Sequence, residues 1–143
     1  MARDIAPDPL VFGWAWPVFG ATAALSTLFA PRADNRRVWL IAALVMALGV
    51  AAPIFIGGIA GIVGSALLVG GTFMVITMAG MQEARQVGGA SLMAAMTAAF
   101  AAGQITGPLV VSALAHLRSG MTVALSIAAG LLVASALALA RAR

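Results

Sequence analysis

Few side chains in this sequence have types that could do acid–base, nucleophilic or metal chemistry. The chain has one histidine, four carboxylates and no cysteine. His116 has no carboxylate near it in the sequence that could orient it as a general base. Serine and threonine hydroxyls therefore lack an activating base, and a metal ion lacks a set of ligands. We expect no enzyme activity, no cofactor and no metal site.

A second group of polar side chains lies inside long apolar runs. Polar groups cost free energy in lipid and usually face the protein interior. Gln104 stands out because its amide has an acceptor oxygen and two donor hydrogens that need partners. It either lines a polar pathway or bridges neighbouring helices, whereas a threonine can bond to a carbonyl of its own helix. The polar side chains that stand out inside these runs are Thr72, Thr77, Thr97, Gln104, Thr106 and Ser112.

The elements that would position these residues are apolar helices, and the clearest evidence is the stretch over residues 38–82. It contains no Asp, Glu, Lys, Arg or His. A transmembrane helix needs roughly 20 apolar residues, so this stretch is long enough for two crossings. Pro53 and the glycine pair that follows it break the stretch near its middle. We predict a membrane hairpin with helices over residues 38–56 and 59–81.

The rest of the chain is similarly apolar. Of its 143 residues, 63% are hydrophobic and 8% are charged, whereas soluble domains contain about 25% charged residues. This composition excludes a water-soluble fold and predicts an all-α, polytopic membrane helix bundle that forms one transmembrane domain over residues 1–143. We expect about five transmembrane helices, over residues 11–30, 38–56, 59–81, 92–115 and 121–140.

The charged residues lie between these expected spans. All eight positive charges are arginines, and five crossings would place six of them on one side and two on the other. The positive-inside rule then makes the six-arginine side, with the C-terminus, cytoplasmic, in a bacterial inner membrane. A net charge of +4 scattered over loops makes no basic stripe, so nucleic acid is not an expected partner. The expected cytoplasmic loop with the densest charge contains Arg32, Asp34, Arg36 and Arg37.

Glycines four residues apart let helix backbones approach closely in a membrane. This spacing arises often by chance in apolar helices, so packing against neighbouring helices is a simpler use of it than homodimerisation. The expected packing glycines are Gly57, Gly61, Gly103 and Gly107.

Several runs in the sequence resemble segments of major facilitator superfamily transporters of the YbfB/YjiJ type. Residues 8–20, a tryptophan-containing run, resemble the segment that enters the eighth transmembrane helix of that family. Residues 32–37 are similar to the acidic and basic loop between helices eight and nine. Residues 70–74 and 103–108 resemble parts of helices ten and eleven. The resemblance covers essentially the whole chain.

This resemblance implies that the chain corresponds to helices eight to twelve of a twelve-helix fold, in which substrate binds between two halves. It also implies that helices seven, eight, ten and eleven border the cavity. The resemblance thereby makes Thr72, Thr77, Thr97 and Gln104 the candidates for lining the substrate cavity. The implied function is transport of a small solute by the C-terminal part of a secondary transporter. Because alternating access needs both halves, we expect this part to be truncated and inactive alone.

The expected partners are the lipid bilayer, an unidentified small solute, and either a missing N-terminal half or another membrane protein. A different class of function stays open at this point. The chain could be a small membrane scaffold or regulator that packs on another membrane protein through its alanine and glycine faces.

Overall fold

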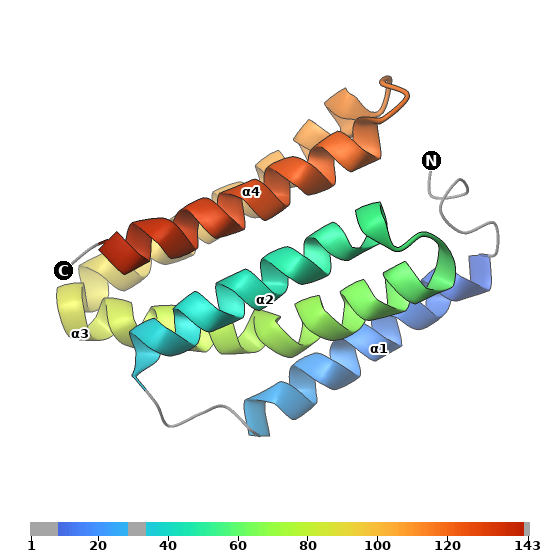
Figure 1. Cartoon of the computed structure of the whole chain (residues 1–143). Coiled ribbons are helices and arrows are strands. Elements are labelled where there is room, and N and C mark those ends of the chain that lie inside the picture. Colours follow the sequence, from blue (N-terminus) through green and yellow to red (C-terminus); the bar gives the residue numbers. More distant parts are fainter. Residues whose placement is uncertain (1–8, 29–33, 142–143) are drawn as a thin grey trace.

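The computed structural model describes residues 9–28 and 34–141 of the chain, and this part contains helices and no strand. The helices are α1 (Pro9–Leu28), α2 (Asn35–Phe55), α3 (Gly58–Leu114) and α4 (Gly120–Arg141) (Figure 1). Three of them, α2, α3 and α4, are long and apolar enough to cross a membrane. The predicted all-α membrane helix bundle is therefore confirmed.

The chain turns between α2 and α3 at the residues that were expected to break the apolar stretch. Pro53 lies in the last turn of α2, and the helix ends two residues later. Gly58 then adopts a φ of 72°, which favours glycine because it has no Cβ. A connection of two residues is therefore enough to reverse the chain.

Helix α3 consists of two arms that meet at Gly89, the first over residues 58–88 and the second over residues 90–114. Gly89 has a φ of 59° and a ψ of −149°, which are not helical values. Figure 1 shows α3 turning back near the end of the molecule where α2 begins, so the two arms run antiparallel. The arms contact each other, because a Cβ placed at Gly80 would lie 3.2 Å from the Cε of Met96. Residues 82–91 were expected to connect two separate helices. They are instead helical up to Gly89 and again after it.

The buried core of the described residues is made of small side chains. Eight of the nine buried hydrophobic residues are alanines, and Met46 is the ninth. Helix α2 packs against both α3 and α4, and α1 packs against α3. A Cβ placed at Gly49 of α2 would lie 2.7 Å from the Cβ of Leu68 in α3. Small residues therefore let these helices approach closely, as membrane helices commonly do.

The start of α2 corrects the expectation for the charged loop. Asp34 is the N-cap of α2, and its carboxylate accepts a hydrogen bond of 3.3 Å from the backbone N–H of Arg36. An N-cap satisfies one of the free N–H groups of the first turn. Arg36 and Arg37, which were expected in a loop, consequently lie in the first turn of this helix. Arg32 lies outside the described residues.

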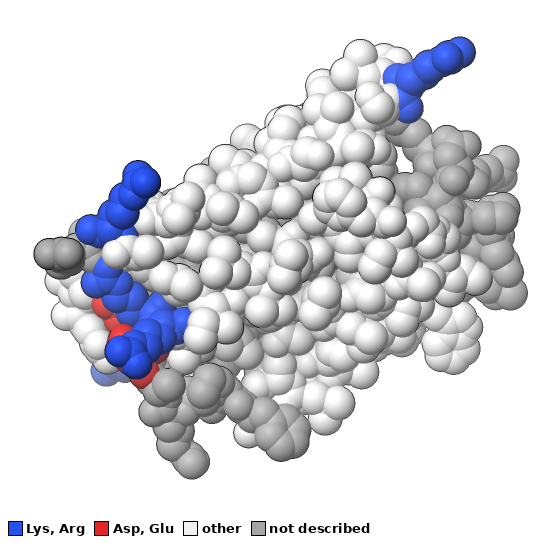
Figure 2. All heavy atoms as spheres, in the orientation of Figure 1, with Lys and Arg blue, Asp and Glu red and all other residues white. Residues whose placement is uncertain are grey.

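The charged side chains among the described residues lie at the two ends of the bundle, and the face shown in Figure 2 is uncharged between them. The start of α2, the turn between the arms of α3 and the end of α4 meet at one end (Figure 1), which carries Arg36, Arg37, Arg85 and Arg141. The opposite end carries Arg118, in the connection before α4. This distribution is the one expected of a bundle that spans a bilayer.

Candidate functional site

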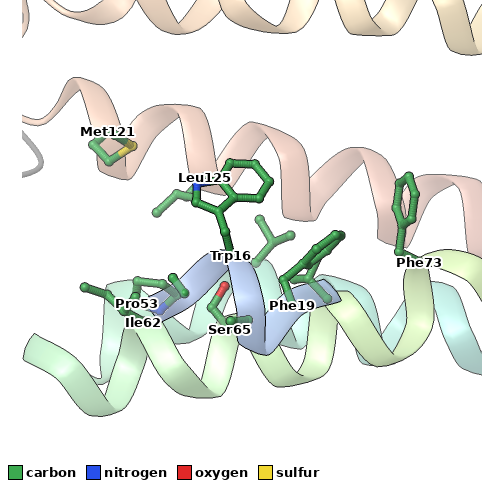
Figure 3. Close-up of a pocket in the computed structure, with 12 residues that line it drawn as sticks. Trp16, Phe19, Pro53, Ile62, Ser65, Phe73, Met121 and Leu125 are labelled. Carbon is green, nitrogen blue, oxygen red and sulfur yellow. The ribbon is translucent and has the colours of Figure 1, made fainter. Parts of the chain in front are cut away.

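An open cavity of about 500 Å³ lies between α1, α2, the first arm of α3 and α4 (Figure 3). The residues that line it are Ala15, Trp16, Phe19, Val50, Pro53, Ile62, Ser65, Ala66, Val69, Phe73, Met121 and Leu125. None of these twelve residues is charged, and the Ser65 hydroxyl and the Trp16 indole N–H are their polar side-chain groups. The volume falls within the range of small-molecule sites, which are mostly apolar with a few polar groups.

Four aromatic rings form a row in which the first three line this cavity and the fourth contacts the third. We call these residues, Trp16, Phe19, Phe73 and Phe100, the aromatic row. The ring centroids of successive members are 6.1 Å, 5.8 Å and 6.3 Å apart. These separations and the inclined ring planes are typical of favourable aromatic pairs. Figure 3 shows the first three rings, with Trp16 and Phe19 projecting from α1 and Phe73 from α3. The row therefore connects α1 with both arms of α3.

The local sequence explains why the row forms. Trp16 and Phe19 are three residues apart in a helix, so their side chains lie on the same face. Gly70 brings α3 close to this part of α1, because a Cβ there would stand 3.0 Å from the Cα of Phe19. Thr22 lies at the same contact, and its hydroxyl donates to the carbonyl oxygen of Val18 at 2.8 Å. The close approach thus leaves no unsatisfied hydroxyl at this position.

The threonines predicted to line a substrate cavity have their hydroxyls satisfied locally. Each donates to the carbonyl four residues earlier: Thr72 to Leu68 at 2.7 Å, Thr77 to Phe73 at 2.8 Å and Thr97 to Met93 at 2.9 Å. A threonine hydroxyl in a helix commonly bonds to a carbonyl of its own helix in this way, as expected for these residues. These hydroxyls can still accept a hydrogen bond from a ligand, because an oxygen that donates keeps its lone pairs.

None of the four predicted cavity residues lines the 500 Å³ cavity. Thr72 lines a cavity of about 340 Å³ between α2 and α3, with Arg37 at its charged end. Thr97 and Gln104 are exposed on the second arm of α3, where their spacing from Phe100 puts all three side chains on one helix face. The structure therefore places Thr97 and Gln104 on the helix face that carries Phe100, and Thr72 in a separate cavity.

Sequence reasoning missed the aromatic row. The spacing of Trp16 and Phe19 was the local signal, but it does not show which other helices adjoin α1. Phe73 and Phe100 join the row only because α3 doubles back at Gly89 and its first arm packs on α1.

The four glycines expected to pack helices occupy different environments. Gly61 is buried, and a Cβ there would meet the carbonyl of Ile56 and lie 3.3 Å from the Cα of Pro53. A Cβ at Gly57, Gly103 or Gly107 would meet no described atom within 4 Å, apart from the backbone of the glycine's own turn.

A second cavity, of about 480 Å³, lies at the arginine-bearing end of the bundle, where Arg36 and Glu83 both line it. Arg36 also donates a hydrogen bond to the carbonyl oxygen of Leu139, in the last turn of α4. A cation at a helix C-terminus interacts favourably with the unpaired carbonyls there. The first turn of α2 is thereby connected to the end of α4.

The apolar helices, the uncharged middle of the bundle and the charged ends define an integral membrane protein. A family model described as "Uncharacterised MFS-type transporter YbfB" matches residues 1–140. Because this match spans nearly the whole chain, the protein belongs to the YbfB-type family of major facilitator transporters, as the resemblance indicated. Membership of this family supports a transport function. No curated protein and no solved structure matches the chain.

Proposed function

We propose that this chain forms the C-terminal part of a secondary transporter that moves a small solute across the bacterial inner membrane. The observation that carries the proposal is the family match over residues 1–140. The uncharged cavity between four helical segments supports it, because transporters of this type bind solute between helices near the membrane midplane.

We further propose that the chain transports only together with a complementary set of helices. Residues 97–113 of the second arm of α3 are all exposed, and they include the amide of Gln104. A glutamine side chain facing lipid costs free energy, and interhelical hydrogen bonds relieve this cost. An adjoining half with polar groups opposite this arm would supply those bonds and the second side of the transport site.

The proposed orientation places the C-terminus in the cytoplasm. Among the described arginines, four lie at the end of the bundle where α2 begins and α4 ends, and Arg118 lies at the other end. Cytoplasmic loops of inner-membrane proteins carry an excess of arginine and lysine. This rule supports a cytoplasmic position for the four-arginine end.

Purification and reconstitution of the full chain test the proposed transport and the proposed need for a partner. We expect the tagged chain, solubilised mildly from native membranes, to co-purify in equal amount with a polytopic protein that supplies the missing half. Vesicles containing that complex should accumulate at least one solute from a panel of labelled small molecules, and vesicles with the chain alone should not. Transport by the chain alone would contradict the need for a partner.

The exposed second arm also favours a different function, that of a small scaffold or regulator of another membrane protein. An arm exposed over residues 97–113 could pack on any membrane protein with a matching surface. A stoichiometric partner that is not part of a transporter would favour this second function over transport.

A further inference from the structure

We propose that the 500 Å³ cavity takes a flat, uncharged aromatic solute, which packs against the aromatic row. The proposal rests on the proposed transport function, since it names the class of solute that this site would take.

The lining excludes a charged ligand first. None of the twelve lining residues carries a charge that could pair with an anion or a cation. A charged group moved from water into such a site loses its hydration and gains no partner, which costs several kcal/mol or more. The cavity therefore selects neutral solutes, and the Ser65 hydroxyl and Trp16 indole can orient one polar group on them.

The aromatic row then favours a flat ring over an aliphatic group. Trp16, Phe19 and Phe73 all line the cavity and also follow one another in the row. Their ring planes are inclined to one another by 75° and 55°, so faces and edges are both presented along the row. A ligand ring inserted here continues the edge-to-face and offset contacts that aromatic groups prefer. A saturated ligand of the same size gains the burial but not these contacts.

The row is also open enough to receive a ligand. The side chain of Trp16 is 75% exposed and that of Phe100 is 48% exposed. Because the ring of Trp16 is hardly buried by the protein, a ligand can cover it without displacing a packed side chain. Trp16 thus has a ring face available to a ligand in addition to its contact with Phe19.

The test compares an aromatic probe with its saturated counterpart. The full chain is embedded in lipid nanodiscs, and binding of tritiated 2-naphthol and decahydro-2-naphthol is measured by equilibrium dialysis. Nanodiscs without protein give the lipid partition to be subtracted. We expect 2-naphthol to bind roughly 10-fold more tightly, because contacts with two or three rings add to its affinity.

Variants assign that preference to the row. Phe19→Leu and Phe73→Leu keep an apolar side chain and should weaken 2-naphthol binding roughly 2- to 10-fold, with little effect on the saturated alcohol. Trp16→Leu should do the same without a loss of folding, because that ring is exposed, and Trp16→Phe should restore much of the affinity. Phe55→Leu is the matched control, because Phe55 is 83% exposed and does not line the cavity.

Equal binding of the two alcohols, or binding that Trp16→Leu leaves unchanged, would overturn the proposal and leave a groove that takes any apolar group, including a lipid chain. The proposed function fails separately. If 2-naphthol binds with the expected preference and the complex with its partner moves no solute, the site stands and the transport proposal does not. If the complex transports but shows no aromatic preference, only this inference is lost.

Discussion

Gly70 of α3 lies directly against Phe19 of α1. A Cβ placed at Gly70 would stand 2.6 Å from the carbonyl oxygen of Phe19, and it would also collide with the hydroxyl of Thr22. The neighbouring glycine is different, because a Cβ at Gly71 would meet no described atom within 4 Å beyond its own helix backbone. Alanine substitutions at these two adjacent glycines therefore distinguish the effect of helix packing on stability from the effect of helix propensity.

Gly70→Ala should destabilise the protein by about 1–3 kcal/mol, because the added methyl group pushes α1 away from α3. Gly71→Ala should instead leave stability unchanged or raise it by up to about 1 kcal/mol, because alanine is the better helix former. Thermal unfolding of the two variants in the same detergent checks this. Equal shifts in the same direction would show that α1 and α3 are not in close contact at Gly70.

Gly89→Ala should destabilise the turn between the arms of α3. Gly89 has φ 59° and ψ −149°, a combination that is essentially restricted to glycine and costs other residues about 1–3 kcal/mol. Gly103→Ala serves as the control, because Gly103 lies in the second arm with open space at its Cβ position. Thermal unfolding of the two variants in the same detergent checks this. Equal stability of Gly89→Ala and Gly103→Ala would mean that the arms do not reverse at Gly89.

Arg36→Gln should loosen the last turn of α4, since it removes the hydrogen bond to the carbonyl of Leu139. The expected loss is about 0.5–2 kcal/mol for a charge-assisted bond at a helix C-terminus. Amide hydrogen exchange in residues 136–141 should then accelerate. Arg37→Gln is the control, because Arg37 is exposed and its guanidinium lies 3.9 Å from the exposed carboxylate of Asp34. Faster exchange in both variants alike would indicate a general charge effect instead.

The two ends of the bundle should be reachable from opposite sides of the membrane. The natural sequence has no cysteine, so single cysteines can be introduced without background. A membrane-impermeant maleimide should label Ser119→Cys in intact cells and Asn35→Cys only after lysis, because the arginine-rich end is expected in the cytoplasm. Labelling of both positions from the same side would contradict the spanning arrangement.

Gln104→Leu should weaken association with the proposed complementary half. An interhelical hydrogen bond in a membrane contributes about 0.6–2 kcal/mol. The affinity for the partner, measured by pull-down at limiting partner, should therefore fall roughly 3- to 30-fold. Thr97→Val on the same helix face is the control, because the hydroxyl of Thr97 already donates to the carbonyl of Met93. If Gln104→Leu binds as well as wild type, the amide does not lie in that interface.

The parts of the fold that depend on local chemistry could be predicted from the sequence. Pro53 and Gly58 mark the reversal between α2 and α3 because a missing donor and a positive φ act within a few residues. The local bonds of the threonines follow in the same way from the geometry of one helix turn.

What could not be predicted depends on which helices meet. Gly49 and Gly70 lie where two helices approach closely, whereas Gly103 and Gly107 have open space at their Cβ positions. Nothing in the surrounding sequence distinguishes the first pair from the second. Likewise, no pattern within α1 indicates that Phe19 will lie 5.8 Å from Phe73. Such pairings are set by the packing of whole helices, so they become visible only in the folded chain.

The uncharged lining of the 500 Å³ cavity has an electrical consequence. A membrane potential does work only on charge, at about 2.3 kcal/mol per elementary charge for each 100 mV. A neutral solute entering among these twelve lining residues would bring no charge into the field, and the residues themselves offer none to be displaced. The membrane potential therefore does no direct work on a neutral solute entering this cavity, and any electrogenic step of the transport cycle must involve charges located elsewhere.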